Sequence, residues 1–352
     1  MKKLKIIQIG VTHEHAPGKM TTLQLMEDLF DIVGYVDDRQ FVNTPFYTVR
    51  ELALYDKLPV MSLQEALNYP GLDAVTVEVP NNELVPIAME CMKRKIPMHM
   101  DKPAGIDLAL YKELLAGCKS QNIPFQMGYM YRSNPAFQFC LKAARANWLG
   151  EIFEVSADMN HDYGDGTYDA YLGKFKGGIV YNLGCHFFDF FLSLLGKPER
   201  VTSFLRSTPG VPSANHNSGM TVLEYPHATA VFKASAHAPL GIPRRRLKIC
   251  GTKGAIELSP LELFNAPWEM EMILKEGNEE FAAGTHRIQL PLVRDRYEAQ
   301  LREFAAMIRG EISSPYSFEH DYLVHKITLK AAGIPLEEDD LDEDKANLIR
   351  FL

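Results

Sequence analysis

The chain has 352 residues, of which 46% are hydrophobic and 23% are charged, and its net charge is -8. This is an ordinary globular composition, and at about 100–200 residues per domain the length predicts two domains. A nucleic-acid groove needs clustered Lys and Arg, and the densest basic run is only Arg244 to Arg246. We interpret that run as a solvated strand edge, because basic side chains protect edges from pairing. Composition therefore argues against a nucleic-acid partner.

Cysteine usage and hydropathy narrow the class further. The five cysteines are scattered and odd in number, and they show no CxxC spacing. This argues against a disulfide framework or a zinc knuckle and is typical of a reducing cytoplasm. No stretch reaches the roughly 18 apolar residues of a membrane helix, and the apolar run at the N-terminus is too short for a signal peptide. We expect a soluble cytoplasmic protein without a membrane partner.

The first 130 residues alternate between strand-like and helical patterns. Strands are predicted at residues 4–11, 30–38, 73–80, 97–103 and 123–129, and helices at 21–29, 82–95 and 107–121. Strand and helix alternating at this pitch predict a parallel sheet with right-handed crossovers.

Beyond Tyr131 the pattern changes to closely spaced strands. They are predicted at residues 151–160, 200–207, 219–226, 228–236, 245–252 and 254–260, with helices at 135–147, 180–196 and 294–310. Such spacing indicates an α+β domain with a large, mostly antiparallel sheet. We place the domains at residues 1–128 and 129–352.

The turn after the first strand resembles a degenerate dinucleotide-binding loop. Such a loop uses glycines so that the backbone turns tightly and approaches the cofactor pyrophosphate. Gly10 holds the first position, whereas Thr12 and His15 occupy the second and third. Thr12, His13 and His15 are candidate phosphate contacts, and the two histidines are alternatively candidate substrate contacts. A plain turn explains the same pattern, and we expect no metal, because no further ligand set is evident.

The second strand ends at Asp37, 27 residues after Gly10. A carboxylate at that distance is expected to hold the adenine ribose hydroxyls. The carboxylate repels a 2′-phosphate, which favours NAD over NADP. The positive charge of Arg39 offsets part of this repulsion.

Two later motifs carry a family resemblance: "DKPAG" at residues 101–105 and "GGIVYNLGCHFFD" at residues 177–189. With "VPNNEL", "MGYMYRSNPAF", "GTKGAIEL" and "FEHDYLVHKITLKAAG" in this order, the chain resembles the Gfo/Idh/MocA family, to which glucose–fructose oxidoreductase and inositol dehydrogenase belong. The resemblance implies an NAD(P)-binding Rossmann domain followed by an α+β domain for substrate binding and oligomerisation. It also implies oxidation or reduction of a secondary hydroxyl on a sugar, a cyclitol or a sugar derivative, in a homodimer or homotetramer.

The resemblance also suggests catalytic residues. Lys102 matches the catalytic lysine of the family's Glu-Lys-Pro motif, with Asp101 in place of the glutamate. Both residues are also candidate cofactor contacts, and Lys102 and His186 are candidate substrate contacts. His186 matches the family histidine, which we expect to act as general acid or base. Asn182 stands one helical turn earlier, where the family has an aspartate, so it can orient a ring but cannot carry charge.

Further residues are assigned to cofactor and substrate. By resemblance, Pro80 and Asn81 wall the nicotinamide side of the cofactor. Tyr131 and Arg132, where the second domain begins, are candidate substrate contacts. The loop at residues 160–174 is rich in Tyr, Asp and Gly, which suits a polyhydroxylated ring, although an ordinary solvated loop has the same composition. Its candidate substrate contacts are Tyr163 and Asp165.

Two other functions fit the same residues. In the first, NAD stays bound and is recycled, so that a sugar or glycoside is modified by transient oxidation without net NADH. In the second, the chain is a nucleotide-binding sensor on a decayed Rossmann scaffold. The degenerate glycine pattern favours the sensor, whereas the intact Lys102 and His186 argue against it.

Overall fold

The computed structural model describes residues 2–41, 52–163 and 166–336. The chain divides into two compact units. Unit 1 contains Met1–Met130 and Asp295–Tyr322, and unit 2 contains Tyr131–Arg294 and Leu323–Leu352. The first division lies two residues beyond our boundary at residue 128. The segment Asp295–Tyr322, which we had placed in the second domain, groups instead with unit 1.

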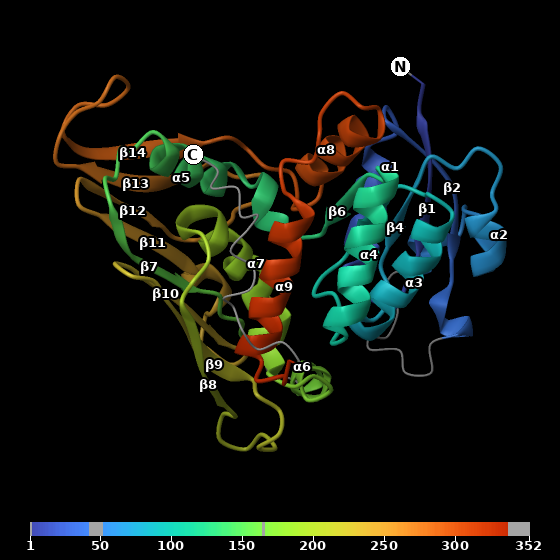
Figure 1. The fold of residues 1–352 in the computed structure, drawn as a ribbon, viewed down its shortest axis with the longest axis horizontal. Helices are drawn as coiled ribbons and strands as arrows, with labels where there is room; N and C mark the ends of the chain where they lie inside the picture. Colours follow the sequence, from blue (N-terminus) through green and yellow to red (C-terminus); the bar gives the residue numbers. More distant parts are fainter. Residues whose placement is uncertain (1, 42–51, 164–165, 337–352) are drawn as a thin grey trace. The chain divides into compact units, whose positions relative to one another are not determined.

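Unit 1 is built on a six-stranded parallel sheet with the order β3-β2-β1-β4-β5-β6 (Figure 1). This is the strand order of the Rossmann fold, so the predicted parallel α/β domain is confirmed. The strands are β1 (Leu4–Ile9), β2 (Phe30–Val36), β3 (Val60–Met61), β4 (Ala74–Val77), β5 (Met98–Met100) and β6 (Phe125–Met127). Only β3, two residues long, was not predicted.

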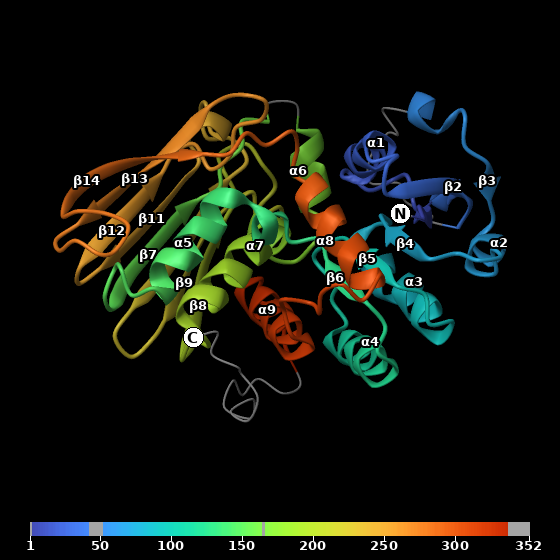
Figure 2. The same cartoon turned by 90° about the horizontal axis from the view of Figure 1, so that it is seen from above.

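Helices cover both faces of this sheet. They are α1 (Ala16–Leu25), α2 (Leu63–Leu67), α3 (Asn81–Lys93), α4 (Leu108–Gln121) and α8 (Glu298–Ile308). Helices α3 and α4 pack together on one side, and α1 and α8 on the other (Figure 2). Leu301 and Phe304 of α8 lie in one buried cluster with Ile6 of β1 and Leu23 of α1. This apolar contact explains why the segment after residue 294 belongs to unit 1.

Unit 2 contains an eight-stranded sheet with the order β14-β13-β12-β11-β7-β10-β9-β8. Every neighbouring pair is antiparallel except β7 with β10, which confirms the predicted mostly antiparallel sheet. The strands are β7 (Ile152–Asp158), β8 (Arg200–Arg206), β9 (Ser218–Glu224), β10 (Thr229–Ser235), β11 (Arg246–Gly251), β12 (Gly254–Leu258), β13 (Trp268–Leu274) and β14 (Gly284–Leu290). Strands β13 and β14 were not predicted.

One long apolar helix forms the centre of unit 2. Helix α7 (Gly178–Leu195) packs on β9 and β10 and against α5 (Pro135–Arg145). It is long and apolar enough to cross a membrane by composition, but most of it is buried inside the unit, as core helices of water-soluble proteins also are. The remaining α-helix of unit 2 is α6 (Thr167–Leu172), and α9 (Phe318–Ala331) begins in the unit 1 segment and continues into unit 2.

The arginine run differs from our interpretation. Arg246 begins β11, which is hydrogen-bonded on both sides and is therefore not an edge strand. Arg245 is 3% exposed, and its guanidinium donates to the Asn160 carbonyl at 2.9 Å and to Glu262 at 3.2 Å. Arg245 thus ties loops together inside unit 2, because a buried guanidinium needs several acceptors.

Candidate active site

The predicted cofactor residues gather at the carboxyl ends of the unit 1 strands. Strand order reverses between β1 and β4, and open α/β sheets bind ligands at such a switch point. The turn after β1 leads into α1, and Pro80 caps the start of α3 directly after β4. Asp101 and Lys102 follow β5, which pairs with β4. Parallel pairing therefore brings together residues that are far apart in the sequence.

Gly10 is required by its position. Its φ is +105°, and a Cβ there would lie 2.3 Å from the backbone oxygen of Glu78. Only glycine allows this close approach of β1 to β4 in that conformation. The first glycine of the dinucleotide pattern is thus present for the expected physical reason.

Asp38, which the sequence analysis did not select, holds the loop after Gly10. Its carboxylate accepts the backbone N–H groups of Val11 at 2.9 Å and Thr12 at 3.2 Å, and the Thr12 hydroxyl donates to it as well. Thr12 is fully buried and its hydroxyl is engaged by this bond. We had considered Thr12 a phosphate donor, and its bond to Asp38 favours a role in shaping the loop instead.

Asp37, the residue that we predict to bind the ribose, directly follows β2 and caps the next short helix. Its Oδ1 atom accepts from Arg39 Nε at 2.8 Å, and this hydrogen bond lowers the pKa of the Asp37 carboxyl. Asp37 is therefore ionised at neutral pH, and Arg39 offsets part of its charge.

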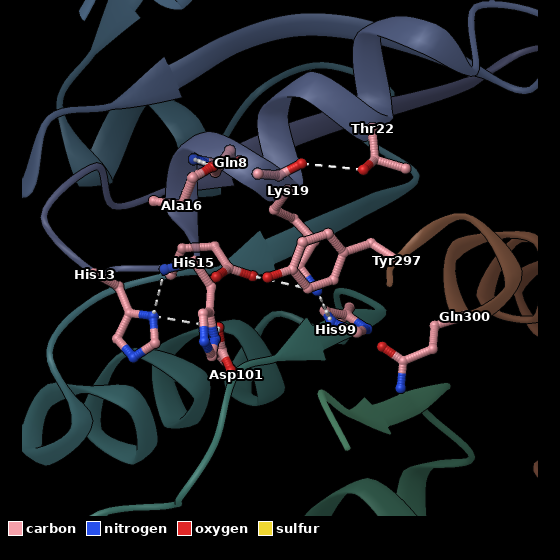
Figure 3. A network of polar contacts seen from close by, with 12 residues as sticks. Gln8, His13, His15, Ala16, Lys19, Thr22, His99, Asp101, Tyr297 and Gln300 are labelled. Atoms are coloured by element: carbon pink, nitrogen blue, oxygen red, sulfur yellow. Dashed lines mark hydrogen bonds and ion pairs between the residues drawn. The ribbon is translucent and has the colours of Figure 1, made fainter. Parts of the chain in front are cut away.

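His13 and His15 point toward Asp101 (Figure 3). The Nδ1 atoms of His15 and His13 lie 2.8 Å and 3.2 Å from Asp101 Oδ2. Burial opposes ionisation of Asp101, but the two imidazoles together hold the pKa of its carboxyl well below its usual range. Burial lowers the pKa of His15, against the opposing effect of Asp101. The loop after β1 is thereby tied to the loop after β5.

Lys102 and Asn81 are both enclosed by unit 1. Lys102 is 1% exposed, and its backbone N–H donates to Asp101 Oδ1 at 2.7 Å. Asn81 is fully buried, and neither polar atom of its side-chain amide has a hydrogen-bond partner in the described part of the chain. A buried amide without partners costs free energy unless a ligand supplies them. Asn81 therefore fits a site for a group with both a donor and an acceptor, such as a carboxamide.

A buried polar network below this cluster was missed by the sequence analysis. Lys19 Nζ lies 2.7 Å from His99 Nε2, 4.1 Å from the centroid of the Tyr297 ring and 3.9 Å from Glu78 Oε1 (Figure 3). Burial, followed by the charge of Asp101, raises the pKa of Glu78 well above its usual value. Burial lowers the pKa of His99 to about 3, so His99 is neutral and accepts from Lys19. Polar residues inside the buried runs "VTVEVP" and "PMHMDKP" were the available signal.

Unit 2 supplies the predicted His186 from the buried helix α7. His186 is 2% exposed, and its ring lies edge-on to Tyr131 at 5.7 Å between centroids. Tyr131 itself stacks on Phe137 at 4.1 Å. Aromatic packing thus restricts the orientation of the His186 ring.

Asn182, one turn before His186, contacts two tyrosines of α6. Its amide nitrogen donates to the Tyr168 hydroxyl at 3.0 Å, and its oxygen accepts from Tyr171 at 3.4 Å. Tyr163 packs against Tyr168 at 4.7 Å between centroids and is 37% exposed. The predicted loop residues therefore include an aromatic cluster next to α7, whereas Asp165 lies outside the described residues.

Arg132 forms a buried ion pair with Asp189 of α7. Arg132 Nη2 lies 2.6 Å from Asp189 Oδ1, and the side chains are 4% and 3% exposed. Two further contacts, from Arg132 Nε to both carboxylate oxygens at 3.1 Å, make the pair bidentate. This pairing favours a structural role for Arg132 over the substrate contact that we had assigned to it.

A second imidazole–carboxylate pair in unit 2 was also missed. His237 Nε2 lies 2.7 Å from Asp169 Oδ2, and Asn217 donates to Asp169 Oδ1 at 2.7 Å. The partners are 68 residues apart, so no local spacing indicates them. The candidate catalytic residues Lys102 and His186 lie in different units.

Comparison with known proteins identifies relatives. Residues 137–257 match the model of the GFO/IDH/MocA C-terminal domain. The oxidoreductase YhhX of Escherichia coli is 30% identical over 145 residues, which cover 41% of either chain. The scyllo-inositol 2-dehydrogenase (NAD(+)) of Bacillus subtilis is 25% identical over 56% of this chain and 58% of its own. The chain thus matches less than two thirds of the length of these relatives.

A solved structure shows that the fold extends over nearly the whole chain. The UDP-N-acetylglucosamine 3-dehydrogenase of Acidithiobacillus ferrooxidans superposes with a TM-score of 0.74 over 95% of this chain and 98% of its own, at 16% identity. At this identity the likeness establishes the fold alone.

Proposed function

The chain belongs to the Gfo/Idh/MocA family, and from this premise we propose that it is an NAD-dependent oxidoreductase acting on a secondary hydroxyl or ketone of a sugar, cyclitol or sugar derivative. One observation carries the proposal. Lys102 is 1% exposed and stands directly after β5, next to the switch point of a sheet with the Rossmann strand order. Burying a lysine costs free energy unless its charge is paired, and this is the position of the family's catalytic lysine.

The residues present fit a dinucleotide. Gly10 allows the close turn, Asp37 offers a carboxylate for the ribose, and the buried Asn81 amide has polar atoms without partners in the described chain. Bound NAD would supply the hydride acceptor. Asp37 favours NAD over NADP because an ionised carboxylate repels a 2′-phosphate.

The proposed substrate follows from two supports. The Bacillus relative is named for a cyclitol and the structural neighbour for a sugar nucleotide. In unit 2, Tyr163, Tyr168 and Tyr171 offer ring faces and hydroxyls close to Asn182. Aromatic faces pack on the C–H surfaces of a sugar ring, and hydroxyls bond its polar groups.

We assign the proton chemistry to Lys102 and His186. The Lys102 ammonium would hydrogen-bond the reacting oxygen, and the His186 imidazole would accept or donate the hydroxyl proton. Asn182 would position helix α7, and Tyr131 would position the ring of His186. Asn182 has only this role, because its amide is not protonated or ionised at neutral pH.

The experiment is to mix purified protein and NAD with a panel of sugars, cyclitols and glycosides, following NADH absorbance and analysing products. We expect a sustained rise with one compound class. Lys102→Ala and His186→Ala should each reduce kcat by at least about 100-fold. The exposed Lys57→Ala and His227→Ala are matched controls and should retain activity. Product without net NADH would instead establish the recycled-cofactor reaction, and NAD binding without turnover of any compound would favour the sensor.

We further propose a cytoplasmic homo-oligomer that uses the open face of the unit 2 sheet. Val222 and Val231 pair in register there and are only partly buried, and Phe204 on β8 is 46% exposed. An apolar sheet face of this kind is commonly covered by a partner. Light scattering of the wild type and of a Val231→Lys variant tests the proposal: the wild type should be dimeric or tetrameric and the variant smaller.

A further inference from the structure

The cluster of His13, His15 and Asp101 contains a hydrogen-bond conflict. The backbone N–H of His15 donates to His13 Nδ1 at 3.3 Å, which requires that this nitrogen carry no proton. The same nitrogen lies 3.2 Å from Asp101 Oδ2, which is also an acceptor. If His13 Nδ1 carries the proton instead, it donates to Asp101 but can no longer accept the hydrogen bond from the His15 N–H. Neither tautomer satisfies both contacts.

A cation between His13 Nδ1 and Asp101 Oδ2 removes the repulsion between these two acceptors, because it takes a lone pair from each, and the contact of the His15 N–H with Nδ1 is then given up. We propose that His13, His15 and Asp101 form a binding site for one divalent transition-metal ion of the zinc type. Two imidazoles and one carboxylate are a common ligand set for such ions.

The distances fit this coordination. Asp101 Oδ2 lies 2.8 Å and 3.2 Å from the Nδ1 atoms of His15 and His13, and the three ligand atoms lie within 4.8 Å of one another. Ligands on adjacent corners of a tetrahedral zinc site, with bonds of about 2.0–2.1 Å, are about 3.3 Å apart. Small side-chain movements therefore bring the three atoms to bonding distance.

Two of the three proposed ligands are buried, and the third is partly exposed to solvent. Asp101 and the His13 side chain are almost fully buried, whereas the His15 side chain is 20% exposed. His15 therefore provides an entry path. Three protein ligands leave a fourth position for water or for an oxygen of a bound small molecule, which is the pattern of catalytic rather than structural zinc sites.

The metal site and the proposed hydride transfer require different side chains. The proposed function depends on Lys102 and His186, whereas the metal site depends on three other side chains within unit 1. A metal-binding measurement without NAD or substrate therefore tests the site independently of turnover.

The test uses the full chain, free of affinity tags and treated with a chelator before dialysis. We expect calorimetry with Zn²⁺ to give one site per chain. His13→Gln, His15→Gln and Asp101→Asn should each weaken it at least about 100-fold. The control is His227→Gln, an exposed histidine of unit 2, which should bind as the wild type does. Absence of stoichiometric binding, or binding that survives all three substitutions, would overturn the proposal.

A second measurement needs no variant and stays decisive if a variant fails to fold. X-ray absorption of the zinc-loaded wild type should show two imidazole nitrogens and oxygen ligands at about 2.0–2.2 Å. A spectrum with sulfur ligands, or with no imidazole, would place the metal elsewhere and reject the site.

Discussion

Asp38 Oδ1 accepts the backbone N–H of Val11 at 2.9 Å, so the acidic end of β2 holds the turn that follows β1. The Thr12 backbone and hydroxyl add two further bonds to the same carboxylate. The carboxylate thus satisfies donors that would otherwise be buried without acceptors. This explains how the loop keeps a defined shape although Gly10 is the only glycine of the dinucleotide pattern that it retains.

Asp38→Ala should destabilise the protein by about 2–4 kcal/mol, because it leaves buried donors without an acceptor. Asp38→Asn keeps an oxygen for the two backbone N–H groups and should cost less than about 1 kcal/mol. Urea unfolding of both variants measures the difference. Equal losses in the two variants would mean that the hydrogen bonds to Val11 and Thr12 are not what stabilises the loop.

The charge of Asp38 predicts a pH effect. Burial raises the pKa of Asp38 above its usual value, although the bonds from Thr12 and Val11 oppose this. The folded state therefore binds a proton more tightly than the unfolded state does. The tighter proton binding by Asp38 in the folded state adds to stability in full below the unfolded pKa of about 3.9. This contribution is lost as the pH rises through the pKa that Asp38 has in the folded state.

The measurement compares the wild type with Asp38→Asn, whose amide does not titrate. The free energy of unfolding of the wild type, minus that of the variant, should fall as the pH rises from about 3 to 6. A difference that stays constant over this range would show that Asp38 has the same pKa in both states.

The Arg132–Asp189 pair predicts a large effect from one substitution. Asp189→Ala removes the carboxylate that binds a buried guanidinium and should cost about 3–5 kcal/mol. The control is Glu280→Ala, which breaks the ion pair with Lys142 on the surface, where both side chains are about half exposed, and should cost less than about 1 kcal/mol. Thermal and urea unfolding measure both.

If Asp189→Ala does not fold, the double variant Arg132→Met/Asp189→Leu removes both charges and should recover stability. A double variant as unstable as Asp189→Ala alone would show that packing, and not the unpaired charge, causes the loss.

Much of the fold could be predicted because its signals are local. Strands β1 and β4 are mostly apolar, and β4 is buried at every position. In strand β13, the sequence "WEMEM" alternates between apolar and acidic residues, and burial alternates along the whole strand. The sequence analysis overlooked this pattern. Strand β3 has two residues and no periodicity to detect.

The site was less predictable because its partners are distant in sequence. His13 and Asp101 are 88 residues apart, and only the pairing order of β1, β4 and β5 brings their loops together. Asp37 and Asp38 are neighbours of the same type, and sequence alone gives no reason to expect that one pairs with Arg39 and that the other holds the loop. The structure separates them, because Asp38 is fully buried and Asp37 pairs with Arg39.

Asp37 should decide the preference between NAD and NADP. In Asp37→Ser the repulsion of a 2′-phosphate is removed, and Arg39 loses the carboxylate that now binds it. Arg39 then becomes available to a phosphate, as in proteins that bind NADP. Fluorescence titration with NADH and NADPH measures both affinities without a substrate. The ratio of NADPH to NADH affinity should rise at least tenfold, or about 1.4 kcal/mol.

Two variants make this prediction specific. Asp31→Ser changes an exposed aspartate at the opposite end of β2 and should leave the ratio unchanged. Adding Arg39→Ala to Asp37→Ser should remove the gain in NADPH affinity while leaving NADH affinity nearly as in the single variant. A ratio that does not respond to Asp37→Ser would mean that another side chain contacts the adenine ribose. If NADPH affinity still increases without Arg39, the increase comes from the loss of the Asp37 charge alone.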